Sequence, residues 1–549
     1  MDGESVDRPR REQAKASPGP GRAYGTQPFL LGYDSRPQPP LIVRLPHSGP
    51  RLKGARPETT DTDVRSRQIT ATLQMSLRAV QAADPAGLAV PALRLAALLD
   101  PAGHPDALWT QPSLLAHLSA YRSVPRGKNT SAGSSRVTAD QARQILRLLH
   151  RHALLIHDPR DEPRAVRVHA PTARAVRDGI ADADLSCLAT AAADALLGAW
   201  PDDDEQNTDL VVALRANTDA LAGHTADHLW RPDGHLVLFQ AGTSLYAAGL
   251  TGAAIGYWQR MVSASERLLG SDHTDTLSAR GSLASCYWRE GRVGEAIELR
   301  EQVLADRERL LGPDHPDTLT ARAHLATSYR YKGRVDEAIK LEERVLADRE
   351  RLLGPDHPDT IEACGHLAIS YSREGHAGEA IELREQVLAD RERLLGPDHP
   401  DTLTARAHLA TSYRYKGRVD EAIELEERVV ADRERVLGTD HPDTLTARAH
   451  LATSYRYKGR VDEAIELEER VVADRERVLG TDHLDTVDAR AELADLYWLD
   501  ARLMDAAALL KGVVADRDLL LGPDHSDTIA TSDDLYVLLD TFSLDGGEE

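Results

Sequence analysis

A histidine flanked by aspartates recurs seven times in the second half of the chain, in the pattern Asp-His-x-Asp. Carboxylates this close to an imidazole could bind a metal ion or exchange protons. Catalysis needs one preorganised site, whereas these copies recur at a fixed interval of 42 residues. We therefore expect a structural role, in which Asp314 caps a helix, Pro316 occupies its first turn and Asp317 faces the positive end of the helix dipole. The histidines are His273, His315, His357, His399, His441, His483 and His525.

A second group with metal-ligand spacing is formed by His224, Asp227 and His228, at positions i, i+3 and i+4 of an expected helix. No additional protein ligand can be identified, so we expect no metal site. The patterns HExxH, GxSxG and a paired Cys-His arrangement are absent from the sequence. The three cysteines, Cys187, Cys286 and Cys364, are odd in number and widely spaced, so they predict neither a disulfide framework nor a zinc site. We expect no catalytic residues, no cofactor and no enzymatic activity.

The 42-residue period predicts a solenoid of stacked supersecondary units. In the unit 315–354, apolar residues follow helical spacing over 319–329, Gly333 ends this first helix as a left-handed cap, and a second helix follows to Gly354. Each unit is therefore expected to be a helical hairpin. Residues 399–440 reappear unchanged as 441–482, which indicates an internal duplication.

The hairpin resembles a tetratricopeptide repeat, because Leu325, Ala326, Tyr329, Gly333 and Ala338 match the signature of that family. The 42-residue length and the linker LGPDHPDT resemble the long repeats of kinesin light chain and of bacterial regulators. We expect an all-α, right-handed solenoid of about seven units over 234–525, with the first unit degenerate, followed by a capping helix and tail over 526–549. The family implies that the first helix of each unit lines a concave groove that binds a peptide or protein.

The first helices end in SYRYKGR, which predicts a basic, tyrosine-bearing stripe along that groove. Such a stripe would suit an extended acidic peptide, although the residues could equally be ordinary solvated helix ends. Kinesin light chain relatives place Asn just before the signature Leu, whereas this chain has Ser282, His324, His366, His408, His450 and Glu492 there. The predicted stripe consists of Arg330, Tyr331, Lys332, Arg414, Tyr415, Lys416, Arg456, Tyr457 and Lys458.

Upstream of the array the pattern changes. Residues 1–65 are rich in Pro, Arg, Gly and Ser and predict a disordered arm. Helices are expected at 69–83, 86–99, 114–121 and 139–152, the last opened by a capping box of Thr138 and Gln141, followed by short strands at 153–157 and 165–169. Helices followed by a two-stranded wing predict a degenerate winged-helix-like module over 66–182, and a helical connector follows over 183–233.

This region resembles the segment that follows the nucleotide-binding domain in bacterial signal-transduction ATPases of the NB-ARC class. The resemblance rests on LAVPALRLAALLDPAGHP, QARQILRLLHRHALLIHD and AVRVHAPTARAVRD, and implies that His169 stands where the family contacts ADP. No phosphate-binding loop, G-x-x-x-x-G-K-[ST], exists in the sequence, so we expect His169 to be a vestigial, packed histidine.

Two alternatives follow from this module. Arg143, Arg147 and Arg151 share one face of the helix at 139–152, which could enter a DNA groove in a transcriptional regulator. The chain could also be a remnant or split subunit of a signal-transduction ATPase supplied by another polypeptide.

The composition favours neither nucleic acid nor membrane as the main partner. The net charge of −22 repels phosphate over most of the surface, so nucleic acid could bind only at a local basic patch. The N-terminus has no apolar h-region, and no apolar run is long enough to span a bilayer. We expect a cytoplasmic, non-enzymatic scaffold for a protein or acidic peptide, and the oligomeric state stays open.

Overall fold

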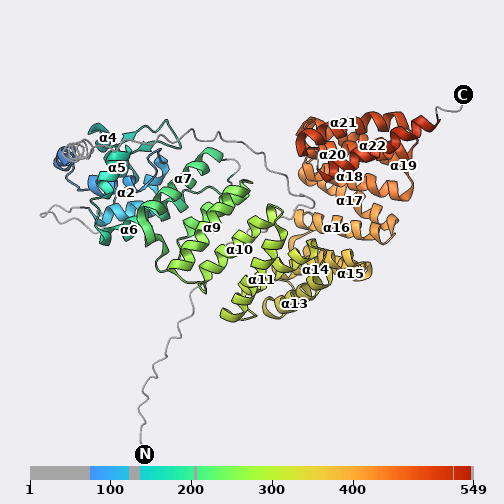
Figure 1. Cartoon of the computed structure of the whole chain (residues 1–549), viewed down its shortest axis with the longest axis horizontal. Helices are drawn as coiled ribbons and strands as arrows, with labels where there is room; N and C mark the ends of the chain where they lie inside the picture. The colour runs from blue at the N-terminus through green and yellow to red at the C-terminus, as the bar shows by residue number, and fades with distance from the viewer. Residues whose placement is uncertain (1–73, 123–135, 203, 205–206, 524, 546–549) are drawn as a thin grey trace, which may run out of the picture. The chain divides into compact units, whose positions relative to one another are not determined.

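The computed structural model describes residues 74–122, 136–202, 204, 207–523 and 525–545, the last five of these by their backbone alone. The expected disordered arm and most of the Gly/Ser-rich loop near residue 130 lie outside the described residues. Almost all regular structure in the described part is helical, and stacked hairpins follow one another along the chain (Figure 1). The prediction of an all-α solenoid fold is therefore confirmed.

The N-terminal part packs short helices against a small hairpin. Thr138 accepts a hydrogen bond from the Gln141 N–H, and Gln141 accepts one from the Thr138 N–H, so the predicted capping box starts α4. The two strands pair antiparallel, with Ile156 opposite Arg167, and are shorter than predicted. The elements are a helix over 74–83, α2 (Ala89–Leu98), η1 (Asp106–Thr110), α3 (Pro112–Ala120), α4 (Ala139–Arg151), β1 (Ile156–His157), β2 (Val166–Arg167) and α5 (Ala170–Arg177). Helices and strands thus occur in the predicted order, while the assignment of this part as a winged-helix-like module stays a prediction.

A connector joins this part to the repeats through α6 (Asp182–Gly198), α7 (Thr208–Thr225) and η2 (Ala226–Trp230). One hydrophobic cluster extends from Val80 to Cys286 and includes the fully buried Trp109 and Trp258. The connector and the first repeats therefore share a core with the N-terminal part.

Each repeat is a pair of helices, here called the A helix and the B helix. The degenerate first pair is α8 (Leu236–Ala247) and α9 (Thr251–Leu268). Six regular units follow, and each helix packs on the next along the chain (Figure 1). Units one to six are α10 (Thr274–Arg289) and α11 (Val293–Leu310), α12 (Pro316–Tyr331) and α13 (Val335–Leu353), α14 (Pro358–Glu374) and α15 (Ala377–Leu395), α16 (Pro400–Tyr415) and α17 (Val419–Leu437), α18 (Pro442–Lys458) and α19 (Val461–Leu479), and α20 (Leu484–Leu499) and α21 (Leu503–Leu521), before the final helix α22 (Ser526–Asp545).

The turn between the A and B helices is made by a glycine, as predicted. Gly333 has φ +81°, in the left-handed region, and the Arg334 N–H bonds to the Tyr329 carbonyl at 2.8 Å across the turn. In unit six Ala501 takes the same place with φ +58°. The turn therefore requires a positive φ at this position, whether the residue is glycine or alanine.

The prediction that Asp314 caps the A helix is wrong. The N-cap is His315, whose Nδ1 accepts the Asp317 N–H at 3.2 Å. Asp314 instead forms an ion pair with Arg351, 2.6 Å away at the end of the B helix of the same unit. An imidazole nitrogen can accept a hydrogen bond from a backbone N–H just as the oxygen of a short side chain does. Pro316 and Asp317 occupy the first turn, as expected.

Candidate partner-binding face of the repeats

The predicted stripe of Arg330, Arg414 and Arg456 does not form one exposed row. Arg330 is only 3% exposed and forms a buried ion pair with Glu342 at 3.1 Å. Its Nη1 also donates to the His366 carbonyl at 3.0 Å and contacts Ser370 Oγ at 3.4 Å, both in the next unit. The side chain therefore joins two repeats and cannot be presented to a partner.

Arg414 repeats this arrangement two units later. It pairs with Glu426 at 3.3 Å and reaches the His450 carbonyl at 3.1 Å and Ser454 Oγ at 3.2 Å. Arg456 is partly exposed, because unit six offers Glu492 and Leu496 where earlier units offer His and Ser. The last arginine of the predicted stripe thus lies in a different environment from the first two.

The intervening junctions use an arginine from the B helix. Arg300 donates to the His324 carbonyl at 3.1 Å and to Ser328 Oγ, and Arg384 donates to the His408 carbonyl at 2.9 Å and to Ser412 Oγ. Each of the first four junctions is therefore joined by one guanidinium, supplied in turn by the B helix and the A helix. Sequence reasoning missed Arg300 and Arg384, although both stand at the position occupied elsewhere by Glu342 and Glu426.

The tyrosines of the predicted stripe are accessible. Tyr331, Tyr415 and Tyr457 are 53%, 75% and 58% exposed, and Lys332, Lys416 and Lys458 beside them are exposed as well. The Tyr331 ring meets Trp288 edge-on, with centroids 5.0 Å apart, and the Arg373 guanidinium lies 5.0 Å from its centroid. Each of the three tyrosines therefore leaves more than half of its side chain accessible to solvent.

A second row on the same helix face is histidine. The A-helix positions of His408 and Tyr415 are seven residues apart, which places both side chains on one face. Desolvation by the surrounding helices, together with Arg384 and Arg391, lowers the pKa of His408 to about 3. The pKa of His450 is lowered to about 4 by desolvation and by Arg414. These imidazoles are neutral at pH 7.

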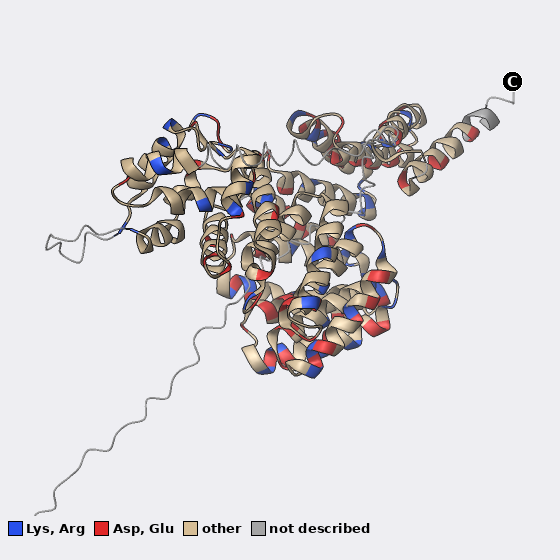
Figure 2. Ribbon diagram, turned by 60° about the vertical axis from the view of Figure 1, so that its left-hand side comes forward, with Lys and Arg blue, Asp and Glu red and all other residues tan. Residues whose placement is uncertain are grey.

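The remaining charges of the repeats are largely paired among themselves. Arg322 is fully buried and bonds to Glu308 at 2.7 Å and Asp348 at 2.9 Å. Unit three has Cys364 at the equivalent position, where burial raises the thiol pKa to about 11. Figure 2 shows basic and acidic residues intermingled on the repeat helices. Exposed charges are paired as well, as in Arg309 with Asp272 at 2.8 Å, and such surface ion pairs contribute little to stability.

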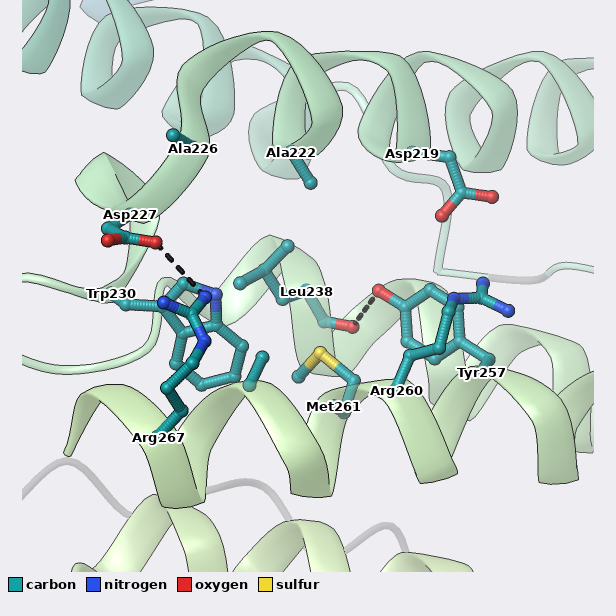
Figure 3. Close-up of a pocket in the computed structure, with 11 residues that line it drawn as sticks. Asp219, Ala222, Ala226, Asp227, Trp230, Leu238, Tyr257, Arg260, Met261 and Arg267 are labelled. Carbon is teal, nitrogen blue, oxygen red and sulfur yellow. Dashed lines mark hydrogen bonds and ion pairs between the residues drawn. The ribbon is translucent and has the colours of Figure 1, made fainter. Parts of the chain in front are cut away.

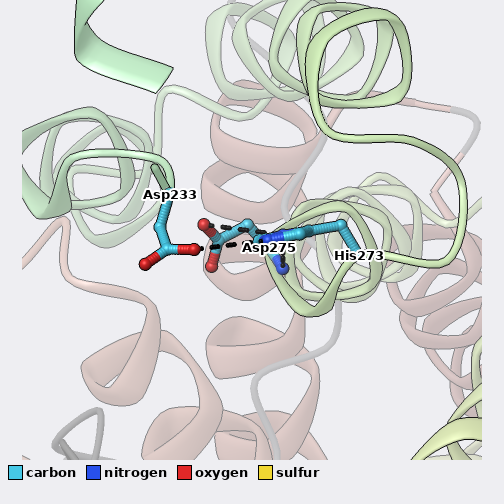
Figure 4. A group of neighbouring side chains, drawn as sticks. All are labelled: Asp233, His273 and Asp275. Atoms are coloured by element: carbon cyan, nitrogen blue, oxygen red, sulfur yellow. Dashed lines mark hydrogen bonds and ion pairs between the residues drawn. The ribbon is translucent and has the colours of Figure 1, made fainter. Parts of the chain in front are cut away.

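A cluster of metal-ligand residue types lies where the connector meets unit one (Figure 4). His273 Nε2 is 3.3 Å from Asp233, and Asp275 Oδ2 is 3.8 Å from His273 Nδ1. The same Nδ1 accepts the Asp275 N–H at 3.2 Å, as every repeat histidine does at its cap, and Asp275 accepts the Gly234 N–H at 2.7 Å. Helix capping and loop anchoring therefore account for the cluster.

The three residues with zinc-like spacing are directed to three different partners. His224 Nδ1 meets the Leu98 carbonyl at 2.8 Å, Asp227 pairs with Arg267 at 3.2 Å, and His228 meets Asp182 at 3.1 Å. The structure does not bring them together, so their spacing reflects packing of the connector.

A cavity of about 370 Å³ lies between α7 and α9 (Figure 3). Its floor is apolar and includes Trp230, Leu238 and Met261. Three of its polar side chains are engaged: Tyr257 donates to the Leu238 carbonyl at 2.7 Å, and Arg267 pairs with Asp227. Asp219 also lines the cavity, and burial raises the pKa of its carboxyl. The cavity is thus mainly apolar, with its polar groups at the edges formed by α7, η2 and α9.

The N-terminal part offers a smaller basic surface than the sequence suggested. Arg143 pairs with Asp106 at 2.9 Å, and the same carboxylate accepts from His157 at 2.8 Å. Arg147 and Arg151 stay exposed on α4. The expectation that His169 is packed is wrong: it is exposed, because it is the N-cap residue of α5 and its side chain makes no capping hydrogen bond.

Stacked two-helix units with a glycine turn and a small-residue core define a helical-repeat protein. Residues 275–515 match the family model described as Tetratricopeptide repeat, in the overlapping segments 275–350, 323–393, 365–434, 407–477 and 450–515. The chain belongs to the tetratricopeptide repeat family. Proteins of this class mediate protein–protein interactions.

Solved structures with long repeats are similar to parts of the chain. A Podospora anserina protein, described as a kinesin light chain with nearly identical repeats, is 38% identical over 37% of this chain and 97% of its own, with a TM-score of 0.35. BtubC from P. vanneervenii is 21% identical over 42% and 92%, with a TM-score of 0.37.

A signal-transduction ATPase with a tetratricopeptide repeat sensor, from Pyrococcus horikoshii, is 14% identical over 74% of this chain and 56% of its own, with a TM-score of 0.48. Among curated proteins, none matches the chain at a significant level. In the described part of the chain, no helix combines the length and apolarity needed to cross a membrane.

Proposed function

We propose that this chain is a non-enzymatic scaffold that docks a protein partner on the A-helix face of its repeats. The observation that carries this proposal is the row of accessible tyrosines, Tyr331, Tyr415 and Tyr457, at equivalent positions of three A helices. Tyrosine supplies a large contact area at low entropic cost and is enriched among residues that dominate binding energy. Neighbouring lysines and neutral histidines add polar contacts that an acidic partner can use.

The experiment is affinity capture from native lysate with the intact chain and with a variant carrying Ala at Tyr331, Tyr415 and Tyr457. Tyr536, which is 72% exposed on α22, provides the matched control as Tyr536→Ala. We expect a reproducible partner to be lost from the triple variant and kept by the control. If all three proteins recover the same partners, the A-helix face is not the docking site.

Tyrosine substitutions are preferable to charge reversal of the arginines. A glutamate at Arg330 would face Glu342 inside the junction, and two buried acids would destabilise the repeats. Loss of binding in such a variant would not distinguish a lost contact from a lost fold.

A further inference from the structure

The last B helix of the array, α21, has an outer surface unlike that of the other B helices. Its outward positions hold apolar or small residues, which we call the α21 face: Met504, Ala508, Gly512, Ala515 and Leu519. The equivalent residues of unit five are mostly charged: Asp462, Glu466, Arg470, Ala473 and Arg477. At the positions of Ala508 and Leu519, every other regular unit has a charged residue. The loss of charge is therefore specific to the last B helix.

The α21 face is a continuous exposed stripe along the helix. Its residues are spaced by three or four, so their side chains lie on one side of α21. All five are exposed, and Met504 is 72% exposed. Leu519, at 83%, is the most exposed large hydrophobic side chain in the described part of the chain. A contiguous apolar surface of this kind marks an interaction site.

Gly512, at the centre of the α21 face, has no role in packing within the chain. A Cβ atom at this position would have no neighbour within 4 Å among the described residues. Glycine weakens the interior of a helix, and its usual benefit is the close approach of another backbone. The equivalent residues of the other units have long side chains: Gln302, Arg344, Gln386, Arg428 and Arg470. The glycine thus indicates a helix that packs on α21 from outside.

The α21 face is complementary to itself. Met504 and Leu519 are equally far from the midpoint between residues 511 and 512, and so are Ala508 and Ala515. A two-fold axis at this midpoint would pair two α21 helices antiparallel, with Met504 against the partner's Leu519 and Ala508 against the partner's Ala515. The small residues in the middle would let the helix axes approach to about 8 Å.

The charges beside the α21 face also match in such a pair. The ion pairs of α21 involve Asp505, Asp516 and Arg517, whereas Lys511 and Asp518 are exposed and form none within the described residues. Helical side chains lean toward the N-terminus of their own helix. In the antiparallel pair, Lys511 and the partner's Asp518 therefore lean toward each other along one edge of the contact. This charge complementarity favours a second copy of the chain over an unrelated helix.

We propose that the α21 face joins two copies of this chain as an antiparallel helix pair. Stable interfaces bury about 1,200–2,000 Å² in total, and a contact between two single helices lies at or below the lower end, so a dissociation constant of about 10 µM is expected. This inference goes beyond the docking proposed for the A helices and does not depend on it. A dimer would carry two A-helix faces, so a partner with two binding segments would bind with avidity.

The test is sedimentation velocity of the full chain at concentrations from about 1 to 100 µM. We expect the unmodified chain to shift from monomer to dimer over this range. Ala515→Glu places a carboxylate against the partner's Ala508 and should raise the dissociation constant at least about tenfold. Ala473→Glu makes the same change at the equivalent exposed position of α19 and should dimerise as the unmodified chain does. Far-ultraviolet circular dichroism verifies that both variants keep their helix content.

A charge exchange tests the antiparallel register. Lys511→Glu should weaken the dimer about tenfold, because it places a glutamate near the partner's Asp518. Adding Asp518→Lys to that variant restores opposite charges across the contact and should return the dissociation constant to its original value. A role of either residue within one copy would not produce this recovery.

Two results would overturn the inference: a chain that stays monomeric up to about 100 µM, or a dimer that Ala515→Glu weakens no more than Ala473→Glu does. If a monomeric chain captures another protein and Ala515→Glu loses it, the α21 face belongs to a different partner. A failed charge exchange in a dimer that depends on Ala515 would reject the antiparallel register. The variant with Ala at Tyr331, Tyr415 and Tyr457 should still dimerise, so failure of the proposed docking is seen separately.

Discussion

Replacing Arg330 by Met should destabilise the junction between units two and three, and the loss should grow with pH. Arg330 pairs with Glu342 and bonds to the His366 carbonyl and Ser370 Oγ, and all of these groups are buried or partly buried. Methionine preserves most of the side-chain volume, so the change removes charge and hydrogen bonds more than packing. The perturbation therefore isolates the ionic role of this arginine.

The magnitude follows from the state of Glu342. Burial raises the pKa of Glu342 from 4.5 to about 7, although Arg330 lowers it. A carboxyl whose pKa is higher in the folded chain costs stability as the pH rises through 4.5 to about 7, and costs nothing below that range. Without Arg330 the pKa rises further. We expect a loss of about 1 kcal/mol at pH 5, from the hydrogen bonds alone, and about 3 kcal/mol at pH 8.5, where an unpaired carboxylate would be buried.

Hydrogen exchange measured by mass spectrometry suits this test, because repeat arrays open locally and a global transition would average the effect. Amides of α12, α13 and α14 should lose protection at pH 8.5 far more than at pH 5, after correction for intrinsic exchange. Adding Glu342→Gln should remove the pH-dependent part, and Arg428→Met, an exposed arginine on α17, serves as the control. The same small loss at both pH values would refute the reasoning.

Three further predictions concern stability. Cys364→Arg should restore the missing ion pairs of unit three with Glu350 and Asp390 and stabilise the chain by up to about 1 kcal/mol in urea unfolding, whereas Cys364→Ala should not. Gly417→Ala should cost about 1 kcal/mol because φ is +80°, and Gly365→Ala, inside α14 with open space around it, should be neutral or stabilising. His399→Ala should cost about 1 kcal/mol through loss of the cap to Asp401, with the local effect read by exchange in α16.

Much of the fold could be predicted from the sequence, because the repeated motif gives the length of each unit and the turn glycines show where one helix of the hairpin ends and the next begins. Gly333 and Ala338 could be placed without coordinates, since one needs positive φ and the other a close helix approach. The cap residue could not be placed as reliably. Asp314 and His315 are adjacent and both can accept an N–H, and the choice was decided by Arg351, which lies 37 residues away and pairs with Asp314.

The binding face could be predicted only in part, because exposure depends on the neighbouring unit. Arg330 and Tyr331 are adjacent in sequence, yet one is sealed by Glu342 and Ser370 while the other is open. A signal for this pairing does exist in the sequence. Unit two has Arg330 on its A helix and Glu342 on its B helix. At the equivalent positions unit three has Ser372 and Arg384, so the arginine moves from the A helix to the B helix and the glutamate is absent. Recognising that exchange requires knowing which helix faces meet.

The most direct measurement of partner docking on the A-helix face is hydroxyl-radical footprinting of the intact chain with and without its captured partner. Oxidation of the side chains is read residue by residue by mass spectrometry. The account predicts that Tyr331, Tyr415 and Tyr457 become protected while Tyr536 stays equally reactive. Unchanged labelling of the three A-helix tyrosines in a saturated complex would contradict it.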